Sequence, residues 1–109
     1  MEEQAERRSN ARARLDAWVE ITAQGVRRRL RVFDLSMGGM GIGGSPDELP
    51  RAGPAVCEFP LPGIGLPLEI AGAVAWREDG AARAGIRFGE LDPGLAELLA
   101  SFVGGRLVE

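Results

Sequence analysis

The chain has 109 residues, of which 45% are hydrophobic and 27% charged, with a net charge of −3 at pH 7. These values are typical of one compact domain and exclude a disordered or fibrous chain. All 13 basic residues are arginine, and lysine, histidine and tyrosine are absent. Imidazole catalysis, histidine metal ligation and lysine Schiff bases are therefore excluded, and we expect a binding protein rather than an enzyme.

The first expected elements form a hairpin. Residues 1–7 are polar without any periodicity, so we interpret them as a flexible lead-in. Apolar and polar residues then alternate over 15–22, which predicts a half-buried strand. A turn at Gln24-Gly25 leads into a second strand over 26–35, whose outer face is expected to include Leu35 together with the arginines.

Four more strands are expected after this hairpin. Met40 and Ile42 alternate with glycines in a short strand, and residues 45–54 have the composition of a loop. The other three strands are predicted at 55–61, 66–77 and 82–88, with turns at 62–63 and 78–80. Strict alternation in the longest of them places Trp76 on the same face as Leu68.

The end of the chain changes to a helical period. Asp92 is a suitable N-cap, Pro93 fits the first helical position, and Gly104-Gly105 is expected to stop the helix. Its apolar face is formed by residues three and four apart, namely Leu95, Leu98, Leu99 and Phe102. Six strands followed by one amphipathic helix predict an all-β fold, an antiparallel barrel or sandwich covered by the helix. We therefore expect one domain over residues 8–103 and a tail over 104–109.

Three other sequence patterns are not interpreted as functional sites. The glycines at 39–44 match GxGxxG, but the following prolines and strands exclude the helix that a dinucleotide site needs. Adjacent carboxylates such as Glu78-Asp79 lie in turns and match no calcium loop, so we expect no metal. Cys57 alternates with Phe59 and is expected to be a small buried hydrophobe. A single cysteine excludes an internal disulfide.

The arginines indicate an anionic ligand. Residues 1–31 carry eight arginines against five acids, whereas residues 32–109 carry five against eleven. A solvated tail is one explanation for the arginines near the N-terminus. The spacing of Arg8 and Arg12, however, brings two guanidinium groups within reach of one ligand, and such groups suit phosphate oxygens and guanine. The roles of Arg27, Arg28, Arg29 and Arg31 are left open.

Two motifs together resemble a known family. Arg8-x-x-x-Arg12 is followed by Asp34-x-Ser36-x-x-Gly39 at a strand end. In this order, on this series of strands, the pattern resembles the PilZ domain family of bacterial cyclic di-GMP receptors. Further similarity lies at Glu6-Arg7-Arg8, at Val74-Ala75-Trp76 and at Gly85-Ile86-Arg87-Phe88, so that the resemblance covers about residues 6–103.

The resemblance implies a six-stranded antiparallel barrel with a C-terminal helix. It assigns Arg8 and Arg12 to the phosphates and guanines of cyclic di-GMP. It assigns Asp34, Ser36 and Gly39 to guanine and to the close approach of the ligand. A carboxylate accepts hydrogen bonds from guanine N1–H and N2–H, and no step requires a nucleophile, metal or cofactor.

The expected function is therefore a cyclic di-GMP receptor or adaptor. Binding would change the N-terminal loop and signal to a protein partner, which in this family belongs to motility, pilus or polysaccharide machinery. A PilZ-fold adaptor that acts through protein contacts alone is the alternative. Nucleic-acid binding through the arginines at 27–31 is disfavoured by the acidic net charge and the few aromatic residues. The start of the chain is charged and no apolar stretch reaches a membrane-spanning length, so we expect a cytoplasmic protein.

Overall fold

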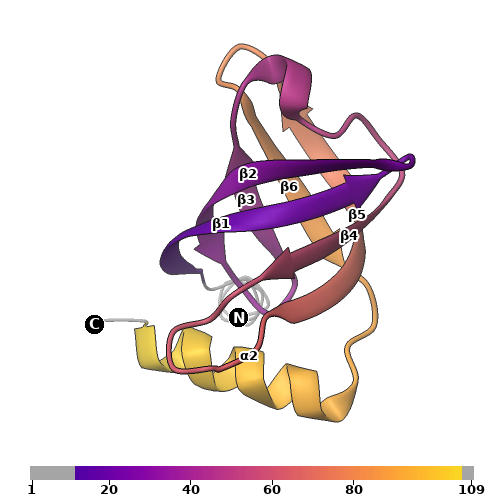
Figure 1. Cartoon of the computed structure of the whole chain (residues 1–109). Helices are drawn as coiled ribbons and strands as arrows, with labels where there is room; N and C mark the ends of the chain where they lie inside the picture. Colours follow the sequence, from indigo (N-terminus) through magenta and orange to yellow (C-terminus); the bar gives the residue numbers. More distant parts are fainter. Residues whose placement is uncertain (1–11, 107–109) are drawn as a thin grey trace, which may run out of the picture.

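The computed structural model describes residues 12–106, which form a closed six-stranded barrel and one α-helix (Figure 1). All strand pairs are antiparallel, and the order around the barrel is β1-β2-β3-β6-β5-β4. The elements are β1 (Ala13–Ala23), β2 (Val26–Leu35), β3 (Gly39–Gly43), the 3₁₀-helix η1 (Pro46–Glu48), β4 (Pro54–Phe59), β5 (Leu68–Glu78), β6 (Arg83–Phe88) and α2 (Pro93–Arg106). The predicted fold class, a barrel with a C-terminal helix, is confirmed.

Alternation of apolar and polar residues builds the core, because every second side chain of a strand points into the barrel. Val19 and Ile21 of β1 and Leu30 of β2 are at most 1% exposed. The barrel closes where Ile21 pairs with Cys57 of β4. Cys57 itself is fully buried, as predicted. Closure joins the two edges of the sheet through β1 and β4, which pair at residues 20–22 and 56–58.

Two β-bulges correct the expected strand faces. The register shifts between Val32 and Asp34, so that Leu35 points inward and is fully buried rather than lying on the outer face. The register also shifts between Val74 and Trp76, which turns Trp76 outward with 45% of its surface exposed. In each strand one extra residue reverses the alternation beyond the bulge. Strict alternation therefore gave the wrong face at both positions.

Strand ends differ from the prediction where prolines intervene. Strand β4 ends at Phe59 rather than Leu61, and β5 begins at Leu68 rather than Leu66. Proline has no N–H for a ladder hydrogen bond, and residues 60, 62 and 67 are prolines. The expected loop at 45–54 contains η1, where the Ser45 N–H donates to Glu48 Oε1 at 3.2 Å.

The helix α2 lies across one end of the barrel, and η1 lies at the opposite end (Figure 1). As predicted, Asp92 caps α2: its Oδ1 accepts a hydrogen bond from the Leu95 N–H at 2.9 Å. Leu99 is fully buried, whereas Leu98 is 37% exposed and does not belong to the packed face. The helix continues to Arg106, past the expected stop at Gly104. Within residues 12–106 no helix has the length and apolarity to cross a membrane.

Candidate ligand-binding site

The antiparallel register brings the two predicted motifs together. Ala13 pairs with Leu35, and Arg14 with Asp34, so the start of β1 lies beside the end of β2. Arg12 precedes β1 directly and therefore lies next to Asp34, although 22 residues separate them in sequence. Arg8, the other predicted arginine, lies outside the residues that the structure describes.

Arg12 and Asp34 form an ion pair. The Arg12 guanidinium donates from Nη1 to Asp34 Oδ1 at 2.6 Å, and the Gly41 N–H donates to the same oxygen at 3.1 Å. The side chains of Arg12 and Asp34 remain 49% and 33% exposed. Because the Gly41 backbone holds the carboxylate in place from β3, Asp34 keeps a defined orientation on the outer wall of the barrel. Gly41 has a structural reason to lack a side chain, since a Cβ there would lie 2.9 Å from Asp34 Oδ1.

Ser36 closes the turn between β2 and β3. Its side chain is buried, and its hydroxyl donates to the Gly39 carbonyl at 3.3 Å while accepting from the Gly38 N–H at 3.3 Å. The Ser36 N–H also donates to the Gly39 carbonyl, at 2.8 Å. Because both hydrogen bonds of the hydroxyl stay within the turn, Ser36 stabilises the conformation of the loop beside Arg12.

Gly39 lies where β3 and β6 approach most closely. A Cβ at this position would overlap the carbonyl oxygen of Ile86, whose strand pairs with β3 through Gly39 and Arg87. Glycine is thus required here by the packing of two backbones. The close approach of a ligand to Gly39 stays a prediction, since the group that approaches it in this structure is the backbone of β6.

A groove of about 350 Å³ lies on the barrel wall beside the Arg12–Asp34 pair. Its lining includes Arg12, Ser36 and Gly39 from the motifs, together with Trp76 and Arg87. The Trp76 indole lies against Gly85 of β6, where a Cβ would overlap the ring. Residues on three different strands and one loop therefore present a cation, an aromatic face and peptide groups to one groove.

Trp76 and Arg87 were not predicted as site residues. The alternation of β5 placed Trp76 inside, and only the bulge beside it reveals its exposed face. A usable sequence signal did exist, because both residues lie in the segments Val74-Ala75-Trp76 and Gly85-Ile86-Arg87-Phe88, which carry part of the resemblance.

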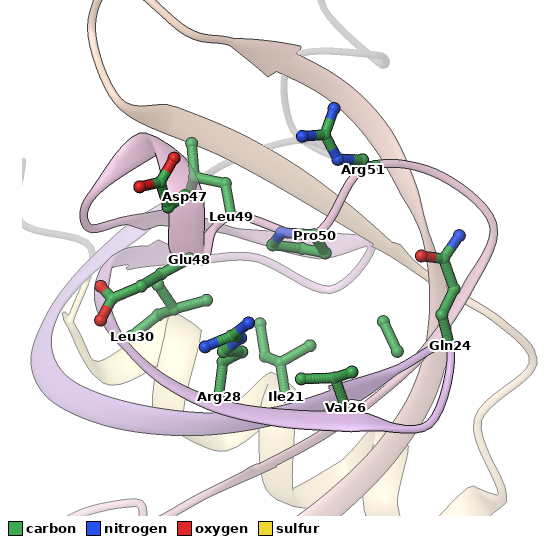
Figure 2. A pocket seen from close by; sticks show the side chains of 11 residues that line it. Ile21, Gln24, Val26, Arg28, Leu30, Asp47, Glu48, Leu49, Pro50 and Arg51 are labelled. Atoms are coloured by element: carbon green, nitrogen blue, oxygen red, sulfur yellow. The ribbon is translucent and has the colours of Figure 1, made fainter.

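Another cavity lies at the η1 end of the barrel and contains none of the predicted site residues (Figure 2). It measures about 130 Å³, and Ile21, Val26 and Leu30 line it in one row with Arg28, opposite the η1 loop. Within residues 12–106 no group of three or more carboxylate or cysteine side chains is placed to hold a metal ion. The groove at Arg12 contains three predicted site residues and an exposed indole, whereas the cavity at η1 contains neither. The groove is therefore the better candidate for a ligand that carries both charge and aromatic rings.

Comparison with known proteins decides the family. A family model described as PilZ domain matches residues 6–105. The chain belongs to the PilZ domain family. The resemblance to this family is thereby confirmed, and this PilZ domain has the barrel and terminal helix that the resemblance implied.

Solved structures share the fold at low sequence identity. The inhibitor of motility MotI/DgrA from Bacillus subtilis has a TM-score of 0.67 at 15% identity, covering 88% of this chain and 49% of that one. The chain thus spans about half the length of that structure. The PilZ domain of CeSA from a cellulose-synthesizing bacterium has a TM-score of 0.66 at 20% identity, covering 86% of this chain and 95% of that one.

A third structure is the PilZ domain of YcgR from Escherichia coli, solved with c-di-GMP. It has a TM-score of 0.62 at 19% identity and covers 87% of each chain. No curated protein matches the chain at the level of sequence. These likenesses establish the fold, and the family is one of cyclic di-GMP receptors or adaptors.

Proposed function

We propose that this PilZ domain binds cyclic di-GMP and passes its state to a partner protein. The observation that carries the proposal is the ion pair between Arg12 and Asp34 at a groove that also presents the exposed indole of Trp76. Cyclic di-GMP has two phosphates and two guanines, so it needs cations, an acceptor for guanine N–H groups and a flat apolar surface. The groove and its border offer all three.

The ligand would exchange partners with the ion pair. Arg12 releases Asp34 and donates to a phosphate oxygen, and Asp34 then accepts from guanine N1–H and N2–H. Each charged side chain leaves one oppositely charged or polar partner and gains another, which limits the cost of breaking the pair. The Gly41 N–H holds the carboxylate during this exchange. No covalent bond forms or breaks in the process, consistent with a family of binding domains.

The remaining motif residues support the proposal in different ways. We assign Arg8 a second charged contact to the ligand, and Trp76 a stacking contact with a guanine. Ser36 and Gly39 act through the turn and the tight strand pairing that hold the groove in shape. A ligand that engages both arginines would change the N-terminal loop and so create a new surface for a partner. We place this event in the cytoplasm.

The class of partner follows from the family only in outline. The resemblance implied motility, pilus or polysaccharide machinery. Among the structural neighbours, MotI/DgrA is described as an inhibitor of motility, and the CeSA domain comes from a cellulose-synthesizing bacterium. We propose a partner from these classes without choosing one.

Calorimetric titration of the full chain with cyclic di-GMP tests the proposal, with GTP and cyclic di-AMP as controls. We expect saturable binding of cyclic di-GMP alone. Fluorescence of the variant Trp18→Phe, in which Trp76 is the remaining tryptophan, should change with the same midpoint. A folded chain that shows no heat and no fluorescence change would overturn nucleotide binding and favour the alternative, an adaptor that acts through protein contacts alone.

A further inference from the structure

A second row of side chains crosses the outer wall of the barrel beside the groove. Trp18 of β1 is paired with Arg31 of β2, Arg31 with Gly43 of β3, and Gly43 with Arg83 of β6. These positions therefore form one line across four strands. The neighbouring line, two residues away along β3, contains Asp34. The second row includes none of the motif residues.

At least one arginine guanidinium lies over each exposed aromatic ring of this region. The Arg29 and Arg31 guanidinium carbons lie 4.7 and 5.2 Å from the centre of the Trp18 ring. Arg83 lies 5.0 Å from the centre of the Phe33 ring, which itself covers Gly43. Trp18 and Phe33 are 46% and 41% exposed. We call this set the arginine–aromatic band: Trp18, Arg29, Arg31, Phe33 and Arg83.

The charges of the band are only partly neutralised. Arg31 forms an ion pair with Asp16. Beside the band, Arg27 pairs with Glu20 and Glu58, and the hydrogen bond that Arg27 donates to Glu20 raises the pKa of this guanidinium. Among the residues that the structure describes, Arg29 and Arg83 form no ion pair and are held only over the rings. Both therefore have donors available for an incoming anion.

Two hollows adjoin the band, and Trp18 lines one of them. One, of about 450 Å³, is lined by Arg31, Phe33 and Arg83 and extends to Arg14 and Asp34. The other, of about 580 Å³, lies between Trp18 and Arg29 on one side and Pro60 and Pro67 on the other. An extended segment could therefore place apolar side chains beside the rings while its charged groups meet the arginines.

We propose that the arginine–aromatic band is a docking surface for an acidic protein segment that also carries an apolar side chain. Unpaired guanidiniums on a protein of net charge −3 select carboxylates by charge complementarity. Tryptophan and arginine are the residues most enriched among energetically dominant interface positions. Because the rings already orient the arginines, less side-chain freedom is lost on binding. A polynucleotide is disfavoured, since it draws on a broad positive field that this acidic chain lacks.

Selection from a random peptide library displayed on phage, with the full chain as bait, tests the docking surface. We expect enriched peptides to combine aspartate or glutamate with an aromatic or aliphatic residue. The tightest peptide, synthesised with a fluorescent label, is then measured by polarisation. Trp18→Ala, Arg29→Gln and Arg83→Gln should each weaken its binding about tenfold. Arg51→Gln, a change of an exposed arginine beside the cavity in Figure 2, serves as the matched control and should leave binding unchanged.

Any one of four results would overturn the docking surface. The selected peptides show no acidic bias, or they bind the three band variants as tightly as the control variant. Alternatively, single-stranded oligothymidylate binds more tightly than the peptide, which would make the band a nucleic-acid surface. Finally, Arg83→Gln lowers the affinity for cyclic di-GMP as much as Arg12→Ala does, which would assign the band to the nucleotide site. The peptide measurement needs no nucleotide and is therefore independent of the proposed receptor function.

Discussion

Arg12 and Asp34 meet on the surface of the barrel, and this location determines what their ion pair can do. Both side chains are partly exposed, so solvent and salt screen their attraction and the pair contributes little to stability. The same exposure leaves both groups accessible to a ligand. A pair of this kind is therefore better suited to exchange with a charged ligand than to hold the fold together.

Removal of the Arg12 side chain should separate binding from folding. Arg12→Ala is expected to lower the affinity for cyclic di-GMP about 10- to 100-fold, because a charge-assisted hydrogen bond worth about 1.5–3 kcal/mol is lost. Its melting temperature should stay close to that of the wild type. Calorimetry and thermal unfolding measure the two effects, with Arg51→Ala as the control. Equal affinities in the two variants would contradict the role of Arg12.

Gly38 and Gly39 are adjacent, but we expect their replacement by alanine to affect stability differently. A Cβ at Gly39 would overlap the Ile86 carbonyl, which belongs to a backbone that cannot move without breaking the β3–β6 pairing, whereas a Cβ at Gly38 meets nothing within 4 Å. Gly39→Ala should therefore lower the free energy of unfolding by about 1–3 kcal/mol, as overpacking does, and Gly38→Ala should leave it nearly unchanged. Urea unfolding of both variants provides the measurement. A loss for Gly39→Ala as small as that for Gly38→Ala would contradict the prediction and show that the strands relax around the added methyl group.

At the scale of elements, the two bulges on the outer wall prepare the candidate site. The bulge in β2 leaves Phe33 and Asp34 on the outer wall and returns Leu35 to the core. The bulge in β5 turns Trp76 outward onto Gly85. Without these irregularities the acceptor and the indole could not share one wall of the barrel. The departures from regular pairing thus coincide with the residues proposed to bind.

The helix α2 is apolar on more than one side, yet only part of it packs. Leu99 is fully buried against the barrel, while its neighbour Leu98 is 37% exposed. Leu99→Ala should lower the free energy of unfolding by about 2–5 kcal/mol, because it leaves a cavity under the helix. Leu98→Ala should cost well under half as much. Chemical denaturation of the two variants checks the difference, and equal losses would place α2 in another orientation on the barrel.

For the molecule as a whole, burial of Cys57 in the closed barrel makes stability depend on pH in the alkaline range. Burial raises the pKa of this thiol from 9.0 to about 12. Between these values the unfolded chain releases its proton while the folded chain retains it, so stability is full below pH 9 and declines as the pH rises toward 12. The sequence has no lysine or tyrosine, so no such side chain titrates in the same window.

The free energy of unfolding should therefore be about 2 kcal/mol lower at pH 10.5 than at pH 8. Guanidinium unfolding at a series of pH values, under reducing conditions, measures it. The variant Cys57→Ala removes the titrating group and should show a nearly flat profile at a lower overall stability. A wild-type profile as flat as that of the variant would mean that the thiol reaches solvent in the folded chain.

Local sequence patterns determined much of this protein. Alternation and turn residues identified six strands, Asp92 and Pro93 identified the start of the helix, and the spacing of Arg8 and Arg12 indicated an anionic ligand. These features depend on residues close in sequence or on side-chain chemistry alone. Strand alternation has a period of two wherever a strand is regular, and it can be read without knowledge of the neighbouring strand.

Only the tertiary structure decided which faces and partners these residues take. A bulge depends on the register against another strand, so the inward turn of Leu35 and the outward turn of Trp76 could not be read from alternation. The same applies to the Ser36 hydroxyl, which is engaged in its own turn, and to the row that joins Trp18 to Arg83 across four strands. Contacts between distant segments arise from how the barrel closes, and closure is a property of all six strands together.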